Sequence, residues 1–308
     1  MDQALTLRRL ADGARQPQPY LAWAERSAHA HSGVKVLSFS SGKGGVGKTH
    51  IVVNLAYALQ RLGARVMLLD ADLGLANVDV LLGLTPRFTI QHVLEGQKTL
   101  NEILLPGPGG ILILPASSGV QELADLNDGQ RLQLLTALET LEHDIDFLLI
   151  DTGAGISANV MYFNVAAQDI IVVATPEPTS ITDAYALMKV LCTKYAEKHF
   201  KVIMNNVAHA TEGKESFRRL SVVAEKFLNI SIDYLGFIPH DAAFSQAVRQ
   251  QKALLDLYPG SSAAQGFRTL AQRLMHSPEA TYPKGNIQFF WRRLLSRQTP
   301  PAPELAGR

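Results

Sequence analysis

A glycine-rich segment has the residue types and the spacing of a phosphate-binding loop. It consists of Gly42, Lys43, Gly44, Gly45, Val46, Gly47, Lys48 and Thr49. The glycines allow successive backbone N–H groups to turn toward a phosphate, and a helix that starts here adds its positive N-terminus. In such a loop Lys48 reaches the β- and γ-phosphate oxygens and Thr49 ligates Mg²⁺. The segment follows an apolar run and precedes a helical pattern, which is the context that this loop requires.

Carboxylates follow two further apolar runs. Asp70 and Asp72 come after residues 65–69, and Asp151 comes after residues 147–150. A carboxylate just past the C-terminal end of a strand faces the crevice in which an α/β fold binds ligands. We expect Asp151 to hold Mg²⁺ through water. Taken alone, the second run is also compatible with a strand that ends in a helix-capping aspartate.

Short apolar runs alternate with longer helical stretches from Val34 onward. The runs cover residues 34–39, 65–69, 110–114, 147–150, 169–174, 201–207 and 234–238. Continuous apolar runs of this kind are typical of strands that are buried on both faces. We therefore expect an α/β fold with a mainly parallel sheet flanked by helices. Asn205 lies near the end of the sixth run, and Pro239 and Asp241 follow the seventh.

The composition narrows the class of protein. Of the 308 residues, 47% are hydrophobic and 19% are charged, which excludes a disordered chain. The formal net charge of +1 provides no global basic field for binding DNA or anionic lipid. Cys192 is the one cysteine in the sequence, so we expect no intrachain disulfide and a cytosolic setting. No apolar stretch approaches the length of a membrane span, so we expect neither secretion nor a transmembrane anchor.

Lys43 is an additional cation that an ordinary phosphate-binding loop does not specify. With Lys43, the loop resembles that of the deviant P-loop ATPases of the MinD and ParA family, which have the SIMIBI type of fold. The resemblance implies an Mg²⁺-dependent ATPase that converts ATP to ADP and phosphate and forms a homodimer around ATP. In that family the lysine reaches the partner's phosphates, so Lys43 and Lys48 are both catalytic candidates. A lysine that points into solvent is the alternative.

The same resemblance assigns roles to the other candidate residues. It implies that Asp72 orients or deprotonates the attacking water and that Asp70 lies close to the Mg²⁺ shell. A carboxylate that caps its own loop is an equally open interpretation of Asp70. Asn205, Pro239 and Asp241 match places where the loops of the family enclose the adenine ring, although asparagine in a loop is usually a turn residue.

Residues 2–8, with the sequence Asp-Gln-Ala-Leu-Thr-Leu-Arg, distinguish members of this family. They resemble the start of the flagellar number regulators known as FlhG or FleN, as do residues 68–84 and 177–187. The resemblance implies a cytoplasmic ATPase that associates reversibly with the inner membrane and regulates flagellar number and placement. It also implies partners: the GTPase FlhF through residues 2–10, and in some bacteria the transcription activator FleQ and switch-complex proteins of the flagellar base. A disordered tail is the alternative for the N-terminal residues.

An amphipathic pattern occupies the last part of the chain. It combines apolar and basic side chains at Ile287, Phe290, Trp291, Arg292, Arg293, Leu294 and Arg297. A helix over residues 285–297 with this pattern suits an anionic membrane surface, and packing on the protein's own surface is the alternative. We expect a partner-activating segment and tether at 1–32, a MinD-like ATPase domain at 33–280, and a membrane-targeting helix and tail at 281–308.

Other functions stay open at this level. A MinD-type ATPase could place the division septum, and a ParA-type ATPase could partition DNA or cargo. We expect no direct DNA binding, because the net charge is nearly neutral. A metabolic P-loop ligase or synthetase would need a second substrate site, for which the sequence holds no motif. A single cysteine argues against an iron–sulfur reductase of the same family.

Overall fold

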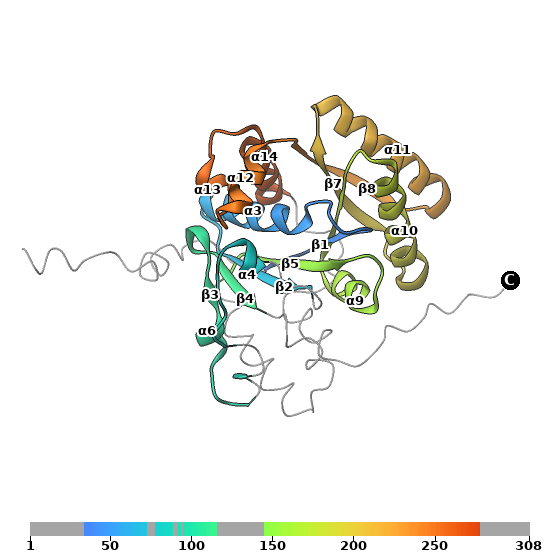
Figure 1. Ribbon diagram of the computed structural model, residues 1–308. Helices are drawn as coiled ribbons and strands as arrows, with labels where there is room; N and C mark the ends of the chain where they lie inside the picture. Colours follow the sequence, from blue (N-terminus) through green and yellow to red (C-terminus); the bar gives the residue numbers. More distant parts are fainter. Residues whose placement is uncertain (1–33, 73–77, 89–91, 94, 116–144, 278–308) are drawn as a thin grey trace, which may run out of the picture. The chain divides into compact units, whose positions relative to one another are not determined.

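The computed structural model describes residues 34–72, 78–88, 92–93, 95–115 and 145–277 (Figure 1). Within them, eight strands form one sheet in the order β3-β4-β2-β5-β1-β6-β7-β8. The strands are β1 (Lys35–Ser41), β2 (Val66–Ala71), β3 (Leu105–Pro106), β4 (Leu112–Pro115), β5 (Phe147–Ala154), β6 (Asp169–Ala174), β7 (His199–Val207) and β8 (Ser231–Pro239). Every neighbouring pair is parallel except β3 with β4. The expected mainly parallel sheet is therefore confirmed.

Helices cover both faces of this sheet (Figure 1). They are α3 (Lys48–Arg61), α4 (Val78–Leu81), α6 (Leu100–Ile103), the 3₁₀ turn η1 (Pro108–Gly110), α9 (Ala158–Ala166), α10 (Pro178–Tyr195), α11 (Ala210–Leu228), α12 (Ala243–Arg249), α13 (Leu254–Leu257) and α14 (Ser262–His276). One apolar core lies between the sheet and α3, α13 and α14, and a second lies between the sheet and α9, α10 and α11. Because both faces are covered, the central strands have continuous apolar sequences.

The position of β1 explains where a ligand would bind. β1 pairs in parallel with β5 on one side and with β6 on the other. Leu37 lies opposite Leu149 and Phe39 opposite Asp151, so the carboxyl ends of β1 and β5 meet at the same edge of the sheet. The glycine-rich loop leaves β1 at this edge.

Helix α3 is a rigid support for that loop. Gly47 precedes it with a left-handed φ of 84°, a conformation that glycine adopts without steric cost. Side chains such as Ile51 and Leu55 are fully buried between the sheet and the C-terminal helices. The N-terminus of α3 is therefore held at a fixed place beside the ends of β1 and β5.

Several predictions concern residues outside the described ranges. They include the partner-binding segment at 2–10, the membrane helix at 285–297 and the three-part division of the chain, all of which stay predictions. Among the described residues, no helix has both the length and the apolar character needed to cross a membrane.

Candidate nucleotide-binding site

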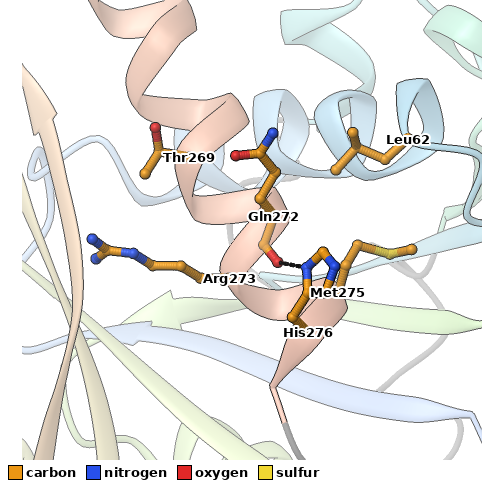
Figure 2. A pocket seen from close by; sticks show the side chains of 6 residues that line it. All are labelled: Leu62, Thr269, Gln272, Arg273, Met275 and His276. Carbon is orange, nitrogen blue, oxygen red and sulfur yellow. Dashed lines mark hydrogen bonds between the residues drawn. The ribbon is translucent and has the colours of Figure 1, made fainter.

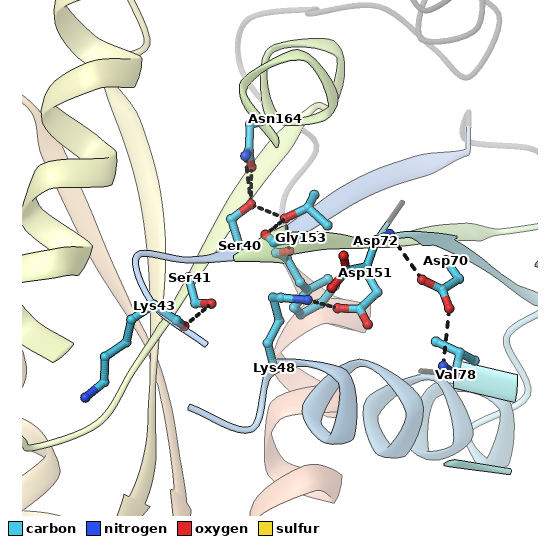
Figure 3. A network of polar contacts seen from close by, with 12 residues as sticks. Ser40, Ser41, Lys43, Lys48, Asp70, Asp72, Val78, Asp151, Gly153 and Asn164 are labelled. Carbon is cyan, nitrogen blue, oxygen red and sulfur yellow. Dashed lines mark hydrogen bonds and ion pairs between the residues drawn. The ribbon is translucent and has the colours of Figure 1, made fainter. Parts of the chain in front are cut away.

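Lys48 and Asp151 form a buried ion pair at the carboxyl edge of the sheet. Lys48 Nζ donates to Asp151 Oδ1 at 2.5 Å, and the two side chains are 7% and 1% exposed (Figure 3). Burying two charges is costly unless they are paired or bound to a ligand. The pair brings the expected phosphate-binding cation and the expected metal-binding carboxylate together in one place.

The glycine-rich loop leaves room for phosphate groups beside Lys48. A Cβ atom added to Gly44 or Gly45 would meet no atom within 4 Å. Thr49 lies in the first turn of α3, next to Lys48. The ammonium group, the N-terminus of the helix, one hydroxyl and one carboxylate form a donor set that fits the phosphates of a nucleotide and the oxygen-loving ion Mg²⁺. Among the described residues no group of three or more His, Cys, Asp or Glu could hold a metal ion, but Mg²⁺ shared with phosphates needs no such group.

Two close approaches hold the loop in place. A Cβ atom on Gly42 would lie 2.1 Å from the backbone carbonyl of Asp183 in α10. A Cβ atom on Gly47 would lie 2.5 Å from Asn205 Nδ2, which donates to Val46 O at 2.7 Å. Asn205, at the end of β7, thus contacts the loop backbone directly. Its expected contact with adenine stays a prediction.

Lys43 points away from Lys48 and Asp151 (Figure 3). Lys43 Nζ donates to Glu177 Oε2 at 2.8 Å and to Thr179 Oγ1 at 3.0 Å. Both partners belong to the start of α10, and the Lys43 side chain is 33% exposed. The additional cation therefore lies at the rim of its own site, with an acidic partner that the sequence analysis did not identify.

The Asp70 carboxylate accepts hydrogen bonds from two backbone N–H groups that follow β2. Its Oδ1 accepts the N–H of Asp72, and its Oδ2 accepts the N–H of Val78, both at 3.2 Å (Figure 3). This geometry supports the loop-capping interpretation of Asp70; its place near Mg²⁺ stays a prediction. Asp72 faces the segment after Asp151, because its Oδ1 lies 3.4 Å from the position of a Cβ atom on Gly153.

Asp241 joins two helices instead of standing free in its loop. Its Oδ1 accepts the N–H of Ala243 at 2.9 Å, and its Oδ2 accepts from Ser262 Oγ at 2.9 Å and from the N–H of Ala263 at 3.0 Å. Burial by itself would raise the pKa of Asp241, but the hydrogen bonds outweigh it and lower the pKa below its ordinary value. Asp241 thereby fixes the loop after Pro239 to α12 and α14. A contact with adenine stays a prediction for both residues.

His50 is a neighbour of the site that the sequence analysis did not single out. It follows Thr49 in α3, and its ring packs edge-on against Phe244 of α12 with the centroids 6.0 Å apart. Burial lowers the pKa of His50, and the negative charge of Asp151 partly opposes this shift. The lowered pKa favours the neutral imidazole at pH 7.

A group of buried polar side chains also escaped the sequence analysis. It consists of Ser38, Ser40, Thr152 and Asn164, each 0% exposed. The signal was present in the sequence, because serine occupies positions 38 and 40, which lie on one face of a buried strand and alternate with the apolar residues Leu37 and Phe39. Thr152 directly follows Asp151 in β5.

A second hollow lies away from this site, at the C-terminal ends of α3 and α14. Its volume is about 560 Å³, and it is lined by Leu62, Thr269, Gln272, Arg273, Met275 and His276 (Figure 2). It contains none of the residues expected to bind the nucleotide. Leu62 and Met275 are 41% and 37% exposed, and Met275 lies two residues before the end of the described part of the chain.

Comparison with known proteins finds matches over most of the chain. The family model of the AAA domain matches residues 34–204. The antiactivator FleN of Pseudomonas aeruginosa is 45% identical over 262 residues, which are 85% of this chain and 94% of that protein. The flagellum site-determining protein YlxH of Helicobacter pylori is 35% identical over 85% of this chain and 90% of its own. Among solved structures, the MinC:MinD cell division protein complex of Aquifex aeolicus matches with a TM-score of 0.61 and 28% identity, over 81% of this chain and 98% of the other.

Proposed function

Because the chain belongs to the MinD and ParA family of P-loop ATPases, together with FleN and YlxH, we propose that it is an ATP-hydrolysing switch that regulates flagellar number and placement. The observation that carries the ATPase part is the meeting of Lys48, Asp151 and Asp72 at one edge of the sheet. The flagellar part rests on the similarity to the two flagellar proteins.

In this proposal some residues bind ATP and Mg²⁺, and Asp72 acts in the chemical step of hydrolysis. Lys48 and the backbone of the glycine-rich loop bind the phosphates. Thr49 would ligate Mg²⁺, Asp151 would hold it through water, and Asp70 would lie close to the Mg²⁺ shell. When bound, Mg²⁺ neutralises charge that develops on the β- and γ-phosphate oxygens. Asp72 orients the water that attacks the γ-phosphorus and accepts its proton, so the products are ADP and phosphate.

ATP also controls assembly in this proposal. Lys43 lies at the rim of its own site, so it can reach a second molecule bound face to face. There it would stabilise charge on the partner's phosphates, as an arginine finger does in trans. Formation of the homodimer would then require ATP, and hydrolysis would release it.

The two ends of the chain would connect this switch to its surroundings. Residues 285–297 would bind an anionic membrane weakly as single helices and more firmly as a pair on the dimer. The protein would then be cytoplasmic and reversibly peripheral at the inner membrane. Residues 2–10 would contact the GTPase FlhF, and FleQ and switch-complex proteins are further candidate partners.

The number of flagella per cell tests the proposal. We expect deletion of the gene to change that number, counted by electron microscopy, and the wild-type gene to restore it. A gene that carries Asp72→Ala should fail to restore the number although its protein accumulates normally. Normal flagella in the deletion strain, together with misplaced septa or lost DNA, would instead favour septum placement or partitioning.

A further inference from the structure

We propose that Asn164 is a positioning residue for ATP hydrolysis, which acts through Ser40 and Thr152 on the segment that follows Asp151. The inference rests on the proposed ATPase function and adds to it a residue of α9 whose side-chain hydrogen bonds go to Ser38, Ser40 and Val160. It is carried by a line of hydrogen bonds behind the site (Figure 3).

The line runs from α9 through β1 to β5. Asn164 Nδ2 lies 2.7 Å from Ser40 Oγ, and Ser40 Oγ lies 2.6 Å from Thr152 Oγ1. Thr152 Oγ1 in turn lies 2.9 Å from Phe39 O. At its other end, Asn164 Nδ2 lies 2.7 Å from Val160 O, one turn earlier in α9. Each of these distances is that of a well-formed hydrogen bond.

The supply of protons gives the line a direction. A hydroxyl carries one proton, and Thr152 Oγ1 has two carbonyl acceptors at 2.9 Å, Phe39 O and Gly153 O, so Thr152 donates to a carbonyl and accepts from Ser40. Ser40 has then used its proton and accepts from Asn164 Nδ2 at 2.7 Å, which is the shorter of its two contacts with that amide; Asn164 Oδ1 lies 3.0 Å away. The amide of Asn164 has two protons, which satisfy Ser40 and Val160 O. No hydroxyl in the line is left without a donor or an acceptor.

Apolar side chains could fill the space that these buried polar side chains occupy. Neighbouring positions on the same side of β5, such as Leu148 and Ile150, are apolar and fully buried. A buried polar network stabilises a fold little better than well-packed apolar side chains, and it is costly when one member is left unpaired. What the network does provide is a fixed geometry for Thr152.

Thr152 lies in the chain between Asp151, which contacts Lys48, and Gly153, which lies beside Asp72. Gly155, two residues on, donates its N–H to Ser41 O of β1 at 2.8 Å. Anchoring Thr152 therefore sets where Asp151 and Gly153 stand, and a displacement of about 1 Å at a reacting group can cost roughly 100-fold in rate.

Ser38 provides a matched control. Its Oγ donates to Asn164 Oδ1 at 2.8 Å, on the same strand and the same face as Ser40 and at the same 0% exposure. It has no contact with Thr152 in the network. Ser38→Ala thus removes one buried hydrogen bond of Asn164 and keeps the line from Asn164 to Thr152.

The experiment compares Ser40→Ala and Asn164→Asp with Ser38→Ala in the full chain. Asn164→Asp keeps the shape of the side chain but removes both amide protons. We expect the kcat for ATP hydrolysis to fall about tenfold in Ser40→Ala and Asn164→Asp while KM for ATP changes less than about twofold. Ser38→Ala should lower the melting temperature about as much as Ser40→Ala and should keep the wild-type kcat.

Amide hydrogen exchange of residues 153–157 with Mg²⁺ and ATP provides a readout that does not depend on turnover. Exchange should be faster in Ser40→Ala than in the wild type, and unchanged in Ser38→Ala. Equal kcat values for Ser38→Ala and Ser40→Ala, or equal exchange, would overturn the positioning role, and Ser40→Ala decides alone if Asn164→Asp does not fold. A wild-type protein that releases no phosphate would refute the ATPase proposal, while the exchange measurement would still decide the role of Asn164.

Discussion

Lys43 and Glu177 form an ion pair within one chain, with Nζ and Oε2 2.8 Å apart, although 134 residues separate them in sequence. The glutamate side chain is 61% exposed, and exposed pairs of this kind contribute only about 0.2–1 kcal/mol. Phosphate oxygens bound by a second protomer can therefore replace Glu177 as the partner of Lys43 with little loss of free energy. The contact of Lys43 with Glu177 in its own chain therefore competes with the proposed contact of Lys43 with the phosphates of the second protomer.

Two substitutions at this pair should change dimerisation in opposite directions. Lys43→Ala should lose the ATP-dependent dimer and keep most of its affinity for nucleotide as a monomer, because Lys48 is untouched. Glu177→Gln should dimerise at a protein concentration up to about 30-fold lower, since up to about 1 kcal/mol of competing interaction is removed from each of the two protomers. Gel filtration with light scattering measures both. A Lys43→Ala protein that dimerises as readily as the wild type would leave Lys43 as a solvated surface lysine.

Asp241 should make the stability of the fold depend on pH in the acid range. Folding lowers its pKa below the ordinary value of 3.8, so the ionised form is favoured in the folded state. Its contribution is fully present above about pH 4 and is lost as the pH falls through the folded pKa. Asp241→Asn should reduce the free energy of unfolding by about 1 kcal/mol at pH 7, because hydrogen bonds to a charged carboxylate are stronger than those to a neutral amide, which also has only one oxygen. Urea unfolding should show this difference shrinking below pH 4, and a difference that stays constant down to pH 3 would contradict the assignment.

The sequence predicts the strands and the phosphate loop because both depend on local pattern. Buried parallel strands need continuous apolar runs, and the runs at 147–150 and 169–174 fall within or coincide with β5 and β6. β3 escapes prediction because two residues carry no pattern. The acidic partner of Lys43 and the amide behind Ser40 also escape, since each contact joins residues more than a hundred positions apart and depends on how α9 and α10 pack on the sheet.

The apolar and basic residues at 285–297 should attach the protein to lipid only when it is a dimer. One short helix binds weakly, and two helices on one particle gain avidity. Full-length protein with ATP should sediment with vesicles that contain anionic lipid, and Phe290→Glu or truncation after Pro283 should abolish sedimentation without changing ATP binding. Equal sedimentation of truncated and full-length protein would rule out this membrane role.

Residues 2–20 should be dispensable for ATP hydrolysis and necessary for a partner. Their deletion leaves every described contact of the nucleotide site intact, so the basal ATPase rate should not change. Stimulation of the GTPase FlhF should be lost, because a short helix-forming segment before a proline-containing tether suits docking on another protein. Full stimulation by the deleted protein would contradict the assignment of residues 2–10.

The ATPase site itself is tested most directly by measuring ATP binding and phosphate release in the same preparations of wild type, Lys48→Ala and Asp72→Ala. Lys48→Ala should bind ATP at least about tenfold more weakly, because a charge-assisted hydrogen bond to the phosphates is lost. Asp72→Ala should bind ATP as the wild type does and release phosphate about 100-fold more slowly, since orientation and deprotonation of water act only in the chemical step. Wild-type phosphate release by Asp72→Ala, or unchanged ATP binding by Lys48→Ala, would contradict the account.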